Sequence, residues 1–129
     1  MRPKPVNQVL VLAEVFERLR QMMASDPGGF CDLYRDYLSD AWQTYAALRL
    51  ACDQHEASEL AGKAHYLKSS SMVLGIRPVA QCCANIEELG RKADFLSASR
   101  KVEETYELLS MVQAELEIKL GPQVVPSAA

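Results

Sequence analysis

Hydrophobic residues recur three and four positions apart in five segments of the chain, the spacing of one face of an α-helix. The pattern therefore predicts five helices. The first follows Asn7 and runs to Met23, and the others occupy residues 27–52, 57–74, 77–90 and 95–120. No segment alternates apolar and polar residues as a half-buried strand does.

Turn and cap residues lie between these segments. Asp26 is a candidate N-cap, with Pro27 at the first position of the second helix. Gly75 is placed to end the central helix, and Gly121-Pro122 to stop the last one. The connections are two to six residues long, which is typical of antiparallel neighbours in a bundle.

We therefore expect an all-α fold: an up-down-up-down four-helix bundle with an additional N-terminal helix that packs across or caps one end. At 129 residues the chain fits one domain, spanning residues 1–129. Residues 1–6 contain two prolines and are expected to form an irregular arm. Residues 121–129 are expected to be a frayed tail.

The same spacing predicts which side chains form the core. Those of the first helix are Val9, Leu12, Ala13, Phe16, Leu19 and Met23; those of the second are Phe30, Leu33, Tyr34, Tyr37, Ala41, Tyr45, Leu48 and Cys52; those of the fourth are Val79, Cys82, Cys83, Ile86 and Leu89; those of the last are Phe95, Ala98, Val102, Tyr106, Leu109, Val112 and Leu116. Trp42 falls about 90° from the stripe of the second helix, at its edge.

The central helix carries the candidate chemistry. Its narrow apolar stripe consists of Leu60, Ala64, Leu67, Ser71 and Leu74. His65 lies about 140° from the centre of that stripe and is expected to face water. Its neighbours on the exposed face are Ala61, Gly62, Lys68, Ser69 and Met72. Gly62 costs a helix interior about 1 kcal/mol against alanine, so a sequence selected for stability alone would not place glycine there.

Composition excludes several classes of function. The net charge is −3 with acids and bases interspersed, so the basic patch of a nucleic-acid-binding protein is missing. No apolar run approaches 18 residues and the N-terminus has no hydrophobic signal core, so we expect no membrane association and a cytoplasmic location, extending to the nucleus in a eukaryote. Cys31, Cys52, Cys82 and Cys83 contain no CxxC pair and are expected to be reduced packing residues. No histidine or cysteine follows His55 at three or four positions, which argues against a zinc site, and no metal site is predicted.

Histidine can serve as a base, a metal ligand or a nucleophile. A base needs an orienting carboxylate, and no acid lies within one turn of His65 along its own helix. A neutral imidazole can instead attack a phosphoryl group, whose charge the Lys68 ammonium would stabilise. Two other possibilities are a helical enzyme or metal protein that uses His65 with Cys or Glu, and a His65 face that is merely solvated.

A motif in the central helix resembles the signature of histidine-containing phosphotransfer (HPt) domains, written roughly A-H-x-L-K-G-S-x-x-x-L-G. The matching residues are Ala64, His65, Leu67, Lys68, Ser70, Leu74 and Gly75. The next helix is similar to the corresponding family helix that ends in L-G-R-K, here Leu89-Gly90-Arg91-Lys92. A looser likeness covers residues 19–48, where family members carry a helix rich in aromatic residues.

The resemblance implies that His65 is phosphorylated and that Lys68 steadies the phosphoryl group. It implies a docking surface for receiver domains, whose aspartates donate or accept the phosphoryl; its residues would be Ala61, Gly62, Ser69, Met72, Glu87 and Arg91. Some relatives have glutamine at position 87, and Glu87 carries the wrong charge for a phosphoryl contact. Glu87 and Arg91, four residues apart, are spaced for a weak mutual salt bridge. Ser69 stands where the family usually has glycine.

The function expected on this basis is that of a monomeric phosphoryl carrier between receiver domains of hybrid histidine kinases and response regulators. The carrier would have no cofactor of its own, because the receiver domain would supply Mg²⁺. The sequence contains no Gly-rich ATP-binding motif, so no autophosphorylation is expected. The alternative is a non-catalytic helical interaction module that binds receivers or kinases without transferring phosphate.

Overall fold

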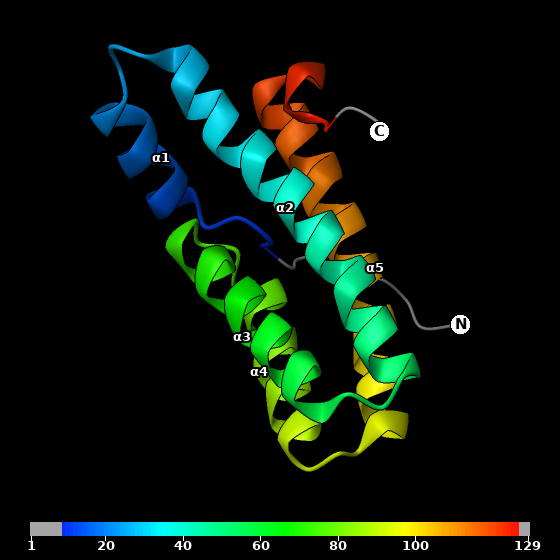
Figure 1. Cartoon of the computed structure of the whole chain (residues 1–129). Helices are drawn as coiled ribbons and strands as arrows, with labels where there is room; N and C mark the ends of the chain where they lie inside the picture. The colour runs from blue at the N-terminus through cyan, green and yellow to red at the C-terminus, as the bar shows by residue number, and fades with distance from the viewer. Residues whose placement is uncertain (1–8, 127–129) are drawn as a thin grey trace.

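The computed structural model describes residues 9–126. Five α-helices and a short 3₁₀ helix occupy this part of the chain (Figure 1). Their bounds are α1, Ala13–Met22; α2, Pro27–Asp53; α3, Ala57–Val73; α4, Arg77–Arg91; α5, Phe95–Leu120; and η1, Pro122–Val124. The all-α prediction is confirmed for the described residues.

The four longer helices form the predicted up-down-up-down bundle. Each runs antiparallel to the one before it, with α3 packed on α2 and α4, and α5 packed on α4 and α2 (Figure 1). The shorter α1 lies at one end of the bundle beside α2, close to the end of α3. Among the described residues, no helix is both long enough and apolar enough to cross a membrane.

Local signals place the helix ends. The Asp26 carboxylate accepts a hydrogen bond from the Gly29 N–H at 3.0 Å, which caps α2. At the end of α3, Gly75 has a φ of +74°, a conformation that glycine adopts without steric cost. The Gly75 N–H donates to the Met72 carbonyl at 3.1 Å and the Ile76 N–H to the Ser71 carbonyl at 2.8 Å. This hydrogen-bond pair is the Schellman motif, so the prediction that Gly75 ends the helix is confirmed.

The predicted stripe of α3 is buried along its whole length. Leu60, Ala64, Leu67 and Ser71 are fully buried, and Leu74 almost so. Ser71 is the single polar member, and its hydroxyl lies 2.7 Å from the buried Tyr37 hydroxyl, so its hydrogen-bonding group is satisfied. The burial of this stripe fixes the rotation of α3 about its axis and so determines which residues face solvent.

The start of the first helix was predicted wrongly. Residues 9–12 are not helical, and α1 begins at Ala13. The adjacent Leu10 and Val11 are both buried, whereas Val9 and Ala13, which were placed on the apolar face, are exposed. A non-helical segment can bury two consecutive side chains, which one face of a helix cannot. Asn7 and the arm predicted at 1–6 lie outside the described residues.

The frayed tail expected after α5 was also predicted wrongly for residues 122–124. Gly121 ends α5 with a φ of +90°, after which residues 122–124 form η1. Val124 is fully buried where η1 packs on α2 and α5. Burial of this one valine side chain from water favours an ordered turn over a frayed end. Residues 127–129 lie outside the described part of the chain.

Tyr106 was placed in the core but is 49% exposed. Its ring lies against Trp42 and Tyr45, with centroids 5.3 and 5.5 Å away, so the three aromatic rings form a cluster at the rim. The neighbouring Thr105 and Leu108 are buried instead. Trp42 is partly buried at the edge of the core, as predicted, and its indole N–H donates to Gln113 at 2.8 Å.

Candidate functional site

The His65 side chain points away from the core of the bundle. It is 59% exposed and lies on the face of α3 opposite the buried stripe. The prediction that this imidazole faces water is confirmed. Its exposure follows directly from the rotation of α3, because the residue before it, Ala64, is fully buried.

A carboxylate on α4 makes contact with the imidazole. Glu87 Oε2 lies 3.1 Å from His65 Nδ1, and Oε1 accepts a hydrogen bond from Lys68 Nζ at 2.8 Å. Arg91 Nη2 donates to Oε2 at 2.5 Å, so the predicted pairing of Glu87 with Arg91 is confirmed. We call these four residues the Glu87 cluster. The Glu87 side chain is only 5% exposed and lies beneath the other three.

The close approach of α3 and α4 brings Glu87 to the imidazole. A Cβ added at Gly90 would lie 3.1 Å from the backbone nitrogen of Ala61, so glycine lets the two helices come together there. Because the helices are antiparallel, moving one turn back along α4 corresponds to moving one turn forward along α3. Glu87 therefore lies opposite His65. No acid lies within a turn of His65 on α3, so sequence reasoning missed this contact.

The surroundings keep Glu87 ionised. The Lys68 ammonium is the largest cause that lowers the pKa of the Glu87 carboxyl, and Arg91 and the hydrogen bond from His65 act in the same direction, against the effect of burial. An ionised carboxylate can only accept hydrogen bonds. Nδ1 of His65 therefore carries the ring proton, and in the neutral imidazole the lone pair is on Nε2. The cluster thus presents Nε2 as the nucleophilic atom.

The side chains around His65 on the exposed face of α3 are mostly small or flexible. Gly62, Ser69 and Met72 are exposed and Ala61 is half-buried. A Cβ added at Gly62 would meet nothing within 4 Å, so no packing contact requires glycine at that position. Glu87 differs from these residues: it was expected on a docking surface, but its buried side chain offers almost no area to a partner. Arg91 is exposed above it.

Tyr66, next to His65 in sequence, was not singled out by sequence reasoning. Its half-exposed side chain donates a hydrogen bond to Asp40 Oδ2 of α2 at 2.5 Å. The phenol is therefore held towards α2. The bond also ties α3 to α2 at the residue beside the imidazole.

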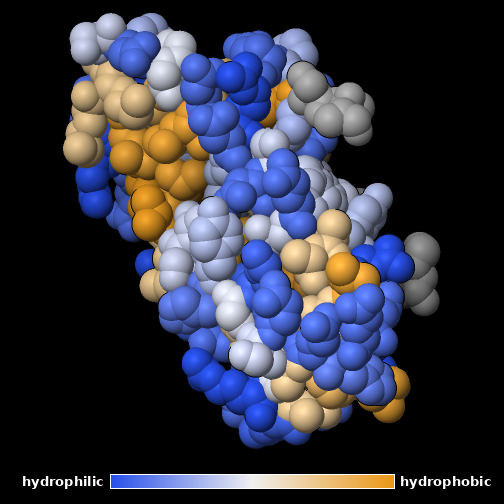
Figure 2. Space-filling view, in the orientation of Figure 1, coloured by the Kyte–Doolittle hydropathy of each residue, from blue (hydrophilic) through white to orange (hydrophobic). Residues whose placement is uncertain are grey.

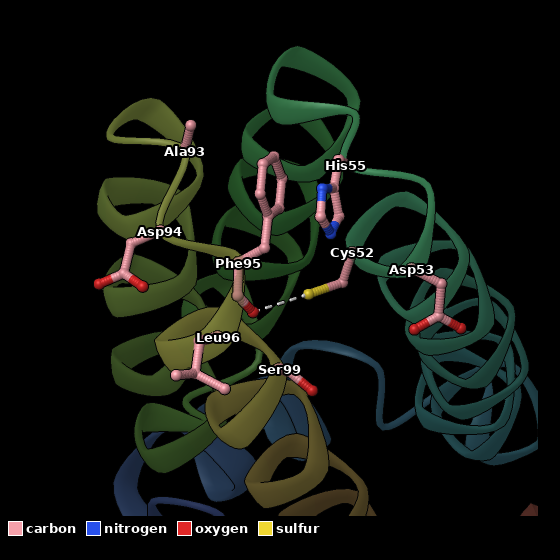
Figure 3. A pocket seen from close by; sticks show the side chains of 8 residues that line it. All are labelled: Cys52, Asp53, His55, Ala93, Asp94, Phe95, Leu96 and Ser99. Carbon is pink, nitrogen blue, oxygen red and sulfur yellow. Dashed lines mark hydrogen bonds between the residues drawn. The ribbon is translucent and has the colours of Figure 1, made fainter.

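A shallow hollow of about 610 Å³ lies at the end of the bundle formed by the α2–α3 and α4–α5 connections (Figure 3). The His55 and Phe95 rings stack there with centroids 4.5 Å apart, and the Cys52 thiol donates to the Phe95 carbonyl at 3.3 Å. Burial raises the pKa of the Cys52 thiol, so this group is not an activated nucleophile. None of the predicted site residues lines the hollow.

The described residues contain no group of three or more His, Cys, Asp or Glu side chains that could hold a metal ion. All four cysteines are free; Cys52, Cys82 and Cys83 are buried and Cys31 is half-buried. The Glu87 cluster gathers two cations and one imidazole around one carboxylate, an arrangement that can interact with an anionic group.

Comparisons with known proteins match the part of the chain that runs from α2 to α5. A family model described as "Hpt domain" matches residues 32–117. Multistep phosphorelay regulator 1 of Schizosaccharomyces pombe is 30% identical over 85 residues, which are 65% of this chain and 29% of that protein. This chain therefore matches less than a third of the length of that relative. The fold is similar to that of histidine-containing phosphotransfer protein B (HptB) from Pseudomonas aeruginosa PAO1, with a TM-score of 0.80, 20% identity, and coverage of 86% of this chain and 94% of that one.

Proposed function

The chain belongs to the Hpt domain family, and on that premise we propose that Nε2 of His65 accepts a phosphoryl group from one receiver-domain aspartate and passes it to another. One observation carries the proposal. The imidazole is exposed to solvent while its Nδ1 is occupied by the Glu87 carboxylate, so the free ring nitrogen is the accessible one.

The transfer needs no proton to enter or leave. The Nε2 lone pair attacks phosphorus, the N–P bond forms, and the bond between phosphorus and the aspartyl oxygen breaks with its electron pair remaining on the carboxylate. The ring keeps its Nδ1 proton and becomes cationic, next to Glu87. Transfer to the next aspartate reverses these changes. The phosphoryl group comes from a partner, so the chain acts as a carrier and does not use ATP.

Lys68 is the cation best placed to stabilise the phosphoryl group. It lies one turn after His65, and its partly exposed ammonium is held by Glu87. We expect Lys68→Ala to slow phosphotransfer or shorten the lifetime of the phosphohistidine, because a cation beside the developing charge is removed. Stopped-flow or quench-flow transfer from a phosphorylated receiver measures the rate. Lys63→Ala removes an exposed lysine from the same helix and serves as the control. Equal rates for wild type and Lys68→Ala would remove Lys68 from the mechanism.

The partner that fits this surface is a receiver domain that brings its own Mg²⁺ and aspartyl phosphate. Its active site must close over His65, and the low surface formed by Ala61, Gly62, Ser69 and Met72 leaves room for it. Apolar area is available near the C-terminal end of α3, where Met72 is 63% exposed. Figure 2 shows further hydrophobic surface between α1 and the start of α2, and α1 lies beside the end of α3.

Two substitutions of Gly62 distinguish an effect on stability from an effect on docking. Gly62→Ala and Gly62→Gln should each stabilise the protein by up to about 1 kcal/mol, because both residues favour a helix over glycine and the site is open. Gly62→Gln should also slow transfer, because its side chain stands one turn from His65 where a partner must approach. Chemical denaturation measures the first effect and transfer kinetics the second. An unchanged transfer rate in Gly62→Gln would place Gly62 outside the docking surface.

Incubation with a receiver domain that carries a radiolabelled phosphoryl group tests the proposed function. We expect label to move to this chain in the presence of Mg²⁺ and to have the stability of a phosphoramidate, labile in acid and stable in alkali. ATP alone should leave the chain unlabelled. Binding of the receiver without transfer of label would support the non-catalytic interaction module instead.

A further inference from the structure

We propose that Glu87 is a positioning residue that raises the transfer potential of the phosphoryl group on His65, so that this carrier gives the group up readily to the next aspartate. The inference rests on the proposed function. It concerns the equilibrium of phosphoryl transfer between carrier and receiver. This is a separate question from which atom of His65 is phosphorylated.

The location of the Glu87 carboxylate is the first argument. It is nearly buried and makes contact with the imidazole, the ammonium of Lys68 and the guanidinium of Arg91. Both of its oxygens accept hydrogen bonds, and the other three side chains of the Glu87 cluster lie over it. A negative charge fixed within hydrogen-bonding distance of the reacting ring changes the free energy of both the free and the phosphorylated imidazole.

The charges of the cluster give the second argument. Lys68 and Arg91 are already paired with the carboxylate before any phosphoryl group arrives. A phosphoryl group adds up to about two negative charges, which repel Glu87 and compete with it for the Lys68 ammonium. With an uncharged side chain at position 87, both cations would be free for the phosphoryl group. The positive charge that the ring gains offsets only one of these two negative charges, so the phosphorylated side chain is more negative than the free imidazole, and Glu87 disfavours it electrostatically.

The ring proton gives the third argument. Phosphorylation of Nε2 leaves Nδ1 protonated, and the Glu87 carboxylate accepts that proton's hydrogen bond. When the next aspartate attacks phosphorus, the N–P bond breaks and its electron pair returns to Nε2. A ring that keeps its Nδ1 proton leaves as a neutral imidazole, whereas a deprotonated ring would have to leave as an anion. By holding the proton in place, Glu87 keeps the neutral imidazole as the leaving group and so speeds breakage of the N–P bond, whereas its effect on the equilibrium comes from the charges of the cluster.

The equilibrium of the transfer reaction tests this inference. Wild type, Glu87→Gln and Glu88→Gln are each mixed with the same phosphorylated receiver and Mg²⁺, and the label on carrier and receiver is measured once the ratio is constant. We expect Glu87→Gln to raise the carrier-to-receiver ratio of label by about fivefold, the effect of one unit charge about 4 Å away when it is fully screened by water. The isolated phosphorylated variant should also lose its label to water more slowly. Glu88→Gln removes an exposed charge from the same helix and should match wild type.

A further variant separates charge from structural damage. Glu87→Asp alters the geometry but keeps the charge, so its ratio should stay closer to wild type than that of Glu87→Gln. A ratio for Glu87→Gln that equals wild type, or that moves towards the receiver, would overturn the inference. So would equal shifts in Glu87→Asp and Glu87→Gln. Failure of the proposed function would be recognised separately, because wild type itself would then take no label.

Discussion

His65→Gln is expected to abolish phosphorylation of the chain by a phosphorylated receiver, to below the limit of detection. An amide nitrogen has no lone pair available for attack on phosphorus, so no other property of the side chain can compensate. The fold should persist, because the position is solvent-exposed and substitutions at such positions usually change the free energy of unfolding by no more than about 0.5 kcal/mol. Transfer of radiolabel together with circular dichroism measures both effects.

The second histidine provides the matched control for that experiment. His55 lies in the α2–α3 connection, stacked on Phe95 and away from the Glu87 cluster. His55→Gln should be labelled as wild type is. Label that persists on His65→Gln, or that is lost from His55→Gln in a folded protein, would refute the assignment of His65.

Leu67→Ala is expected to destabilise the protein by about 2–5 kcal/mol, the range for truncation of a fully buried leucine. Leu67 lies in the middle of the buried stripe of α3, so truncation leaves a cavity between helices in the core of the bundle. Urea denaturation at equilibrium measures the loss. Met72→Ala on the exposed face of the same helix is the control and should change the free energy of unfolding by no more than about 0.5 kcal/mol. Similar values for the two variants would contradict the observed rotation of α3.

The sequence was sufficient to predict the exposure of His65, for a physical reason. The rotation of a helix is determined by which residues it buries, and the stripe from Leu60 to Leu74 is regular enough to define that face. Lys68 follows at one turn, so its position near the imidazole was also predictable from helical geometry. These two residues needed no information from any other helix.

The contact between Glu87 and His65 could not be predicted in this way. The two residues are 22 positions apart and lie on different helices, so their contact depends on how far α4 is shifted along α3. That shift depends on packing, including the close approach at Gly90. The pairing of Glu87 with Arg91 on one helix was predictable, but the burial of the carboxylate beneath three other side chains was not.

The chain ends were misjudged because their apolar residues show no periodicity. Leu10 and Val11 are adjacent, and Val124 lies beyond Gly121-Pro122, so none of them belongs to a helical face. All three are buried because the bundle offers apolar surface where the chain passes over it. Tyr106 is the opposite case. It matches the helical spacing of the core residues of α5, but its side chain lies at the edge of the core against Trp42.

The most direct test of the account is to identify the atom that carries the phosphoryl group. The protein, labelled with nitrogen-15 in its histidines, can be phosphorylated by its receiver and examined by phosphorus and nitrogen NMR. The structure predicts one phosphorylated residue, His65, with phosphorus bonded to Nε2 and the proton retained on Nδ1 beside Glu87. Phosphorus bonded to Nδ1, or to any residue other than His65, would contradict it.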